Sequence, residues 1–240
     1  VIEKLKAHWN PDEIAGFLKR TKDERYVSKT AIYGWLRTSR GERYCVWLYS
    51  KRKRVKKRIP KTKRSLIPNR VGIERRNDGA NNRSRFGHWE RDTVVSKKGT
   101  QGGVSTHQER KSRFFVVRKV ESMRPAEHAD TLQYVADTYT VKSVTMDNGI
   151  ENRDHEKIGV PTFFCDPYSS WQKGGDENGN KMFRYFFPKR TDFTYVTQKE
   201  IDDACYIIND KPRKILGYWS AREIATKAKL FKNTSVLIEG

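Results

Sequence analysis

The chain has 240 residues, and its 50 Lys and Arg against 29 Asp and Glu give a formal net charge of +21. Such an excess of positive charge excludes a typical metabolic enzyme and favours a polyanionic partner, with nucleic acid the first candidate. The length suits one sizeable domain and a smaller one, and no apolar run approaches the roughly 20 residues that span a bilayer.

Residues 1–50 are predicted to be helical. In NPDEIAGFLKR, Asn10 is suited to cap a helix that begins at Pro11, and apolar residues recur at helical spacing. VSKTAIYGWLRTSRG predicts a second short helix after a polar turn. The pair fits a helix-turn-helix, with an ordinary helical hairpin as the alternative. The second helix carries three candidate DNA contacts off its apolar stripe: Lys29, Tyr33 and Arg37.

Residues 51–86 have a different composition. KRKRVKKRIPKTKRSLIPNR is more than half basic and holds two prolines, which predicts a mobile arm rather than a packed element. Clustered cations would neutralise DNA phosphates and make binding depend steeply on salt, whereas the alternative is a solubilising linker. The candidate DNA contacts in the arm are Lys51, Arg52, Lys53 and Arg54. NDGANNRSR, at its end, is predicted to be a loop.

From residue 87 onward, strands and helices alternate. HWERDTVVS, GGVSTHQER and RFFVVRKV are strand candidates close enough to pair as an antiparallel meander. RPAEHADTLQYVADTY predicts a helix, VKSVTMD a fourth strand, TFF a short fifth strand, and WQKGGDENGNKMFRYFF ends in a helix. Two further helices are predicted at 197–209 and 219–229. This order resembles that of ribonuclease-H-like folds, in which the first and fourth strands lie side by side.

The predicted architecture is therefore α/β and has three parts. Residues 1–50 form a helix-turn-helix DNA-binding region, residues 51–86 a basic linker, and residues 87–240 a ribonuclease-H-like catalytic core with C-terminal helices.

The predicted strand order would bring three carboxylates close together. Asp92 lies in the first strand, and Asp147 ends the fourth in VTMDNGIE, so adjacent strands would bring them together. Glu177 opens the last core helix and can face the same point. Converging carboxylates repel one another unless cations lie between them, and Mg²⁺ or Mn²⁺ suits oxygen ligands. The alternative for Asp147 is a strand end followed by an Asn-Gly turn.

The cysteines and the absence of membrane signals bear on location. Cys45, Cys165 and Cys205 are widely spaced, odd in number and match no zinc pattern, which is typical of a reducing compartment. We find no secretory leader, lipidation signal or strongly apolar amphipathic helix. We therefore expect a cytoplasmic protein with no membrane partner.

Several blocks of sequence, in the same order, resemble the insertion-sequence-thirty family of bacterial DDE transposases: GHWERD, TMDNGIE, DPYSSWQKGGDENGN, YFFPKRTDF and NDKPRKILGYWSAREI. With NPDEIAGFLKR and VSKTAIYGWL they cover most of the chain. The resemblance implies a helix-turn-helix that recognises element ends and an integrase-like catalytic core.

The resemblance also implies an active site and its chemistry. Asp92, Asp147 and Glu177 would be the catalytic triad and would hold two Mg²⁺ or Mn²⁺ ions for DNA cleavage and strand transfer. Lys181 and Arg184 follow Glu177 at i+4 and i+7, on the same helix face, and are interpreted as phosphate contacts. Transposases act as multimers on paired ends, so we expect a homo-oligomer on double-stranded DNA in the nucleoid of a bacterial cytoplasm.

Some positions depart from the family pattern. Asn152 stands where an aromatic residue is usual, Asp176 stands where Asn is usual, and the interval from Asp147 to Glu177 is a few residues short. These departures keep an alternative open, a catalytically weak or inactive DNA-binding relative such as a repressor or a decayed element copy. A ribonuclease-H-like nuclease is a third possibility, but it gives no reason for a helix-turn-helix.

Overall fold

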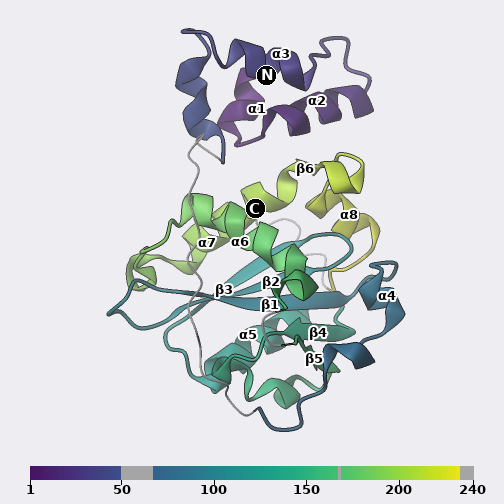
Figure 1. Ribbon diagram of the computed structural model, residues 1–240, viewed down its shortest axis with the longest axis vertical. Helices are drawn as coiled ribbons and strands as arrows, with labels where there is room; N and C mark the ends of the chain where they lie inside the picture. The colour runs from purple at the N-terminus through teal and green to yellow at the C-terminus, as the bar shows by residue number, and fades with distance from the viewer. Residues whose placement is uncertain (50–66, 167–168, 233–240) are drawn as a thin grey trace. The chain divides into compact units, whose positions relative to one another are not determined.

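The computed structural model describes residues 1–49, 67–166 and 169–232 (Figure 1). Contacts within the chain define two compact units, which we call the helical unit (Val1–Thr62 with Asn209–Ile224) and the sheet unit (Lys63–Ile208 with Ala225–Gly240). No helix in the described ranges is both long enough and apolar enough to cross a membrane.

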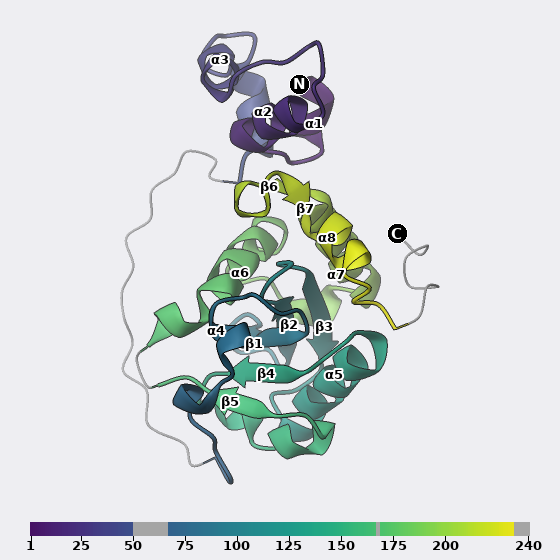
Figure 2. The same cartoon turned by 90° about the vertical axis from the view of Figure 1, so that its right-hand side faces the viewer.

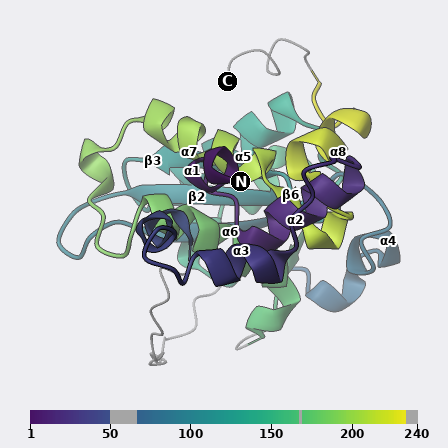
Figure 3. The same cartoon turned by 90° about the horizontal axis from the view of Figure 1, so that it is seen from above.

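The helical unit begins with three α-helices, labelled in Figure 3, which are α1 (Ile2–Lys6), α2 (Pro11–Arg20) and α3 (Lys29–Trp35). They are followed by a 3₁₀ turn, η1 (Glu42–Trp47). Both predicted helices are present. Asn10 precedes α2, and its N–H donates to Glu13 Oε2 at 2.6 Å, which fixes the start of the helix. A small apolar core holds these helices together: Leu5, Trp9, Ile14, Ala15, Ile32, Leu36 and Leu48.

A second segment, almost 200 residues later, belongs to the same unit. It contains β6 (Pro212–Arg213), η7 (Lys214–Leu216), β7 (Trp219–Ser220) and the start of α8 (Ala221–Lys227). The buried ammonium of Lys211 lies 3.0 Å from Glu13 Oε2 on α2. Gly16 lets α2 approach this segment, because a Cβ there would stand 2.0 Å from the Tyr218 ring. The sequence predicts only a connection between helices here.

The sheet unit is built on five strands in the order β3-β2-β1-β4-β5: β1 (His88–Val95), β2 (Gly103–Glu109), β3 (Phe115–Val120), β4 (Ser143–Met146) and β5 (Thr162–Phe164). β1 and β3 pair antiparallel with β2, whereas β4 runs parallel to both β1 and β5. The predicted meander and the predicted contact between the first and fourth strands are both confirmed.

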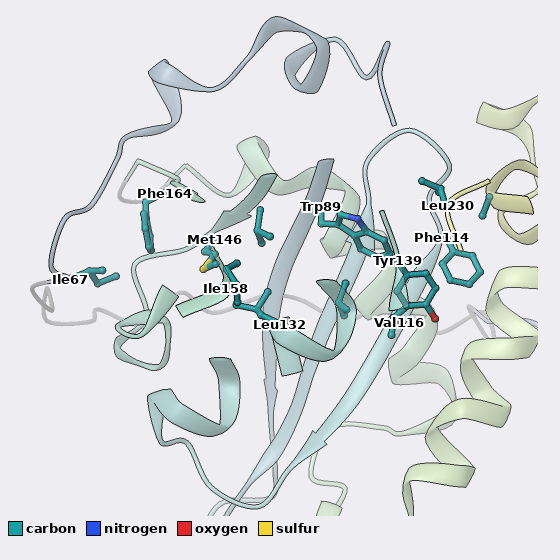
Figure 4. Close-up of a cluster of buried hydrophobic side chains, with 13 residues drawn as sticks. Ile67, Trp89, Phe114, Val116, Leu132, Tyr139, Met146, Ile158, Phe164 and Leu230 are labelled. Carbon is teal, nitrogen blue, oxygen red and sulfur yellow. The ribbon is translucent and has the colours of Figure 1, made fainter. Parts of the chain in front are cut away.

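Helices lie on both sides of this sheet, as Figure 2 shows for α5 (Pro125–Thr138) and α6 (Gly174–Phe186). α5 closes the apolar core of the unit, which Figure 4 shows around Trp89, Leu132, Tyr139 and Met146. The remaining elements are η3 (Ile150–Asn152), η4 (His155–Ile158), η5 (Ser170–Lys173), η6 (Phe193–Tyr195) and α7 (Gln198–Asp210).

The predicted basic arm and loop differ from the structure in their second part. Residues 50–66 lie outside the described ranges, but residues 67–86 contain η2 (Ile73–Arg75) and α4 (Asp78–Asn81). Ile67 and Ile73 are buried, and Phe164 N–H donates to the Val71 carbonyl at 2.9 Å, so this stretch packs beside β5. The apolar residues of this stretch are isolated and show no periodicity, so the sequence alone does not predict that it packs against the sheet.

Candidate active site and DNA-binding residues

Asp92 lies on the side of β1 that faces α6. Its Oδ2 accepts a hydrogen bond from Asn180 Nδ2 at 2.6 Å, and its Oδ1 lies 3.2 Å from Lys173 Nζ. Lys173 Nζ also donates to the Arg91 carbonyl at 2.8 Å, so its ammonium is held against the strand. The Asp92 side chain keeps 30% of its surface exposed, which leaves the carboxylate open to a ligand.

Two glycines explain how α6 approaches the sheet so closely. A Cβ on Gly175 would stand 2.6 Å from Glu90 Oε2, and a Cβ on Gly179 would stand 2.7 Å from the Phe115 ring. Glycine in a helix interior costs roughly 1 kcal/mol relative to alanine. Here that cost permits the close contact that places Asn180 on Asp92.

Asp147 directly follows β4, and the strand register relates it to Asp92. The parallel pairing of His88 with Ser143 and Glu90 with Thr145 has an offset of 55 residues (143 − 88 = 145 − 90 = 55). Continuing this offset puts Asp92 level with Asp147, because 147 − 92 is also 55. The predicted placement of the two carboxylates on adjacent strands is therefore consistent with the register.

The hydrogen bonds of Asp147 also form the turn that the alternative interpretation predicts. Asp147 Oδ1 accepts from the Gly149 N–H at 3.2 Å, which is an Asx-type turn, and from Asn152 Nδ2 at 2.9 Å. Asn152 Nδ2 lies 3.2 Å from the Asp147 carbonyl as well. The carboxylate is thus held at the end of β4 by the turn that follows it.

Asn152 connects this turn to a buried polar network on the α5 side of the sheet. Its Oδ1 accepts from Arg91 Nη1, and Arg91 also donates to Ser105 Oγ at 3.0 Å and to His128 Nδ1. Burial, followed by the positive charge of Arg91, lowers the pKa of His128 to about 3. His128 is therefore neutral and accepts a hydrogen bond from the guanidinium. The only sequence signal for this network is a charged residue at an inward position of a strand.

Glu177 lies in the first half of α6 and is exposed. It precedes Asn180 by three residues, which puts both on one face of the helix. Because Asn180 donates a hydrogen bond to Asp92, this face of the helix is turned towards β1. Asn180 Oδ1 is buried and has no hydrogen-bond partner among the described residues.

The residues of this region suit a hard divalent cation in their chemistry. Asp92, Asp147 and Glu177 offer carboxylate oxygens, and Asn180 offers an unsatisfied amide oxygen nearby. Asp92 already has a cationic neighbour in Lys173. Within the described ranges, however, no three His, Cys, Asp or Glu side chains are grouped closely enough to hold an ion. The structure therefore brings Asp92 and Asp147 to adjacent strands without assembling the three predicted ligands.

The two predicted phosphate contacts on α6 have different surroundings. Lys181 is exposed. Arg184 is partly buried, and its guanidinium donates to the carbonyls of Pro188 at 3.2 Å and Val95 at 3.4 Å, so it ties the end of α6 to the end of β1. Burial lowers the pKa of Arg184. A phosphate would compete with these carbonyls.

The predicted DNA contacts of the helical unit lie on and just after α3. Lys29 and Arg37 are exposed and Tyr33 is partly exposed, whereas Ile32 and Leu36 are buried in the small core. The basic residues at 51–54 lie outside the described ranges. A helix with one buried stripe and a basic outer face suits a groove of DNA, but the same pattern occurs on a solvated helix.

Comparison with known proteins identifies the class of protein. No family model matches the chain. The transposase of insertion sequence element IS4351 from Bacteroides fragilis is 32% identical over 232 residues, covering 93% of this chain and 71% of that protein. The chain therefore belongs to the IS30 family of transposases.

Two further comparisons concern the length of the chain and its fold. Transposase InsI of element IS30C from Escherichia coli (strain K12) is 31% identical over 245 residues. The match covers 93% of this chain but spans 63% of the length of that relative. The catalytic core domain of BIV integrase aligns at a TM-score of 0.48 with 16% identity, covering 60% of this chain and 95% of that domain.

Proposed function

We propose that the chain is a DDE transposase, which cleaves DNA at the ends of an insertion sequence and joins those ends to target DNA. The observation that carries the proposal is the strand register, which aligns Asp92 with Asp147 on adjacent parallel strands. Its membership of the IS30 family supports the same chemistry.

The residues have distinct proposed roles. Asp92 and Asp147 would hold one Mg²⁺ or Mn²⁺ ion, and Glu177 with Asp92 would hold the second. Bound divalent ions stabilise the attacking and leaving oxygens of phosphoryl transfer. Water cleaves the phosphodiester and leaves a 3′-hydroxyl, which then attacks a phosphodiester of the target and releases one of its ends. Asn180 orients the Asp92 carboxylate through its 2.6 Å hydrogen bond.

Double-stranded DNA is the proposed partner, bound by the exposed face of α3, by the residues at 51–54 and by Lys181. The net charge of +21 supports a polyanionic partner of this kind. We further propose that the protein acts as a homo-oligomer on paired DNA ends in the nucleoid of the bacterial cytoplasm.

A nicking assay tests the catalytic proposal. Supercoiled plasmid is incubated with Mg²⁺ or Mn²⁺ and the parent protein, Asp147→Asn, Glu177→Gln or the control Asp154→Asn. Asp154 is a partly exposed carboxylate near the same turn, and it pairs with Lys157 at 2.6 Å. We expect the first two variants to lose nicking by on the order of a thousandfold, and the control to retain it.

Two outcomes would contradict the proposal in different ways. Nicking by Asp147→Asn at the parental rate would leave Asp147 with only its role in the turn. No nicking by any protein, with DNA binding intact, would favour the catalytically inactive DNA-binding relative. Joining of a preformed 3′ end to plasmid DNA separates a transposase from a simple nuclease.

A further inference from the structure

Two loops of the sheet unit are joined into one surface beyond the end of β1. Lys97 N–H, in the loop between β1 and β2, donates to the Thr191 carbonyl at 3.0 Å. Phe193 N–H donates to Ser96 Oγ at 3.0 Å. The loop after α6 is therefore held against the β1–β2 loop by bonds in both directions.

Four cations lie on these joined loops: Lys97, Lys98, Lys189 and Arg190, which we call the hairpin patch. All four are exposed, and none forms an ion pair with a carboxylate of the described residues. The sole acidic residue between 95 and 102 or between 187 and 195 is Asp192. Its Oδ1 is already used by the Thr194 N–H at 3.1 Å.

The hairpin patch is fixed in place rather than carried on free side loops. Arg184 donates to the Val95 carbonyl at the end of β1 and to the Pro188 carbonyl in the loop after α6. Thr191 Oγ1 donates to the Pro188 carbonyl at 2.7 Å, and Ser96 Oγ and Thr100 Oγ1 share a hydrogen bond at 2.8 Å. A preorganised cationic surface loses less conformational entropy on binding than a mobile one.

The position of the hairpin patch along β1 relates it to the candidate active site. Lys97 follows Asp92 by five residues of mostly extended chain, which corresponds to roughly 16 Å. Successive phosphates of one DNA strand advance by about 3.4 Å along the axis, so this span equals about five nucleotides. Tyr195, next to the patch, exposes 85% of its surface and offers an aromatic face.

We propose that the hairpin patch binds the DNA backbone and holds the duplex about five nucleotides from the bond that is cut. It is separate from the proposed contacts on α3 and from Lys181. The inference rests on the proposed function for its position relative to the cut, but the binding of phosphates by the patch does not require catalysis.

A charge-neutralised variant tests the hairpin patch: Lys97→Gln, Lys98→Gln, Lys189→Gln and Arg190→Gln combined. The matched control removes three lysines and one arginine that are also exposed, on other elements: Lys142→Gln, Lys157→Gln, Lys199→Gln and Arg75→Gln. Affinity for a fluorescent DNA duplex is measured by anisotropy over a series of KCl concentrations. The two variants have the same net charge, and EDTA in the buffer prevents metal-dependent catalysis.

We expect the patch variant to bind at least about tenfold more weakly than the control. Each phosphate that the protein no longer neutralises reduces the slope of log K against log salt by about 0.9, so the slope should fall by about 2 to 4. Equal affinities and slopes for the two variants would overturn the proposal. A patch variant that binds DNA normally but changes in oligomeric mass would also overturn it, because the surface would then contact protein.

Crosslinking provides a readout that depends on position. A photoreactive benzoylphenylalanine in place of Tyr195 should crosslink to the duplex, whereas the same residue in place of Tyr134, exposed on α5, should not. Equal crosslinking from both positions would contradict the proposal. Failure of the proposed function appears separately, as a parent protein that binds DNA through the hairpin patch but does not nick it with Mg²⁺ or Mn²⁺.

Discussion

Alternate residues of β1 lie in two different environments. On the α5 side, Trp89 and Arg91 are no more than 1% exposed and lie in the apolar core and the polar network. On the α6 side, Glu90 is as deeply buried beneath Gly175 of α6, but Asp92, two residues further along the strand, is 30% exposed and meets Lys173 and Asn180. The closed side fixes the backbone of the strand, and the open side presents a carboxylate.

The two sides are connected through the end of β4. Arg91 donates to Asn152 on the closed side, and Asn152 donates to Asp147 just after the end of β4. Removing one member of a buried polar network is costly, because the polar group that it contacted loses its hydrogen bond away from water. The comparison therefore predicts that changes on the closed side alter the chemistry on the open side.

Asn152→Leu should break this connection and give the largest effect of any change outside the three carboxylates. Asp147 loses a hydrogen bond and Arg91 loses an acceptor, so we expect nicking to fall by about 10- to 100-fold and the free energy of unfolding to fall by about 1–3 kcal/mol. Plasmid nicking and urea unfolding measure the two effects.

The double variant Arg91→Met with Asn152→Leu separates positioning from folding. Removing both polar partners should restore part of the stability, whereas nicking should stay low because Asp147 still lacks its amide. Restored nicking in the double variant would show that Asn152 serves stability alone.

Gly179→Ala should disturb the open side directly. The added Cβ meets the Phe115 ring at 2.7 Å, so α6 must shift, and we expect a loss of about 1–3 kcal/mol in stability together with slower nicking. Gly34→Ala on α3 is the control, because its Cβ meets nothing within 4 Å and should be neutral or stabilising by up to about 1 kcal/mol. Thermal unfolding of both variants checks the contrast, and a neutral Gly179→Ala would contradict the close packing.

Acid should weaken the closed side gradually, without any change of sequence. Burial lowers the pKa of His128 from 6.5 to about 3, so between these values the unfolded chain takes up a proton that the folded chain does not. Stability should therefore fall as pH drops from 6.5 towards 3, by about 2 kcal/mol near pH 5, since each pH unit in this range corresponds to about 1.4 kcal/mol. Urea unfolding at several pH values should show a flatter pH dependence for His128→Gln. An unchanged slope would locate the titrating group elsewhere, for example at His107, whose pKa is lowered in the same direction.

The strands of the sheet were predictable because they depend on local pattern, whereas the placement of Asp92 beside Asp147 was expected from the resemblance of the strand order to ribonuclease-H-like folds. HWERDTVVS and VKSVTMD alternate or run apolar over several residues, and strand order then makes the two carboxylates neighbours. By contrast, the network of Arg91, Asn152 and His128 joins residues up to 61 positions apart, and no local period encodes such contacts.

The second segment of the helical unit was missed for a related reason. Lys211 is nearly fully buried beside Glu13 and lies 3.7 Å from the centre of the Tyr49 ring. In the sequence, however, it belongs to NDKPRKILGY, which has the composition of an exposed basic loop. A charge that is buried by a partner far along the chain cannot be told from a solvated one by composition.

The helical unit contains residues as far apart in the sequence as Glu13 and Lys211, and this separation affects how the unit forms during protein synthesis. A ribosome that adds about 5–20 residues per second reaches Lys211 roughly 10 to 40 seconds after Glu13. During this interval α2 lacks the ion pair and the Tyr218 ring that packs on Gly16. The helical unit is therefore completed only after most of the sheet unit has left the ribosome. A nascent chain that stops before residue 209 lacks the second segment of the helical unit.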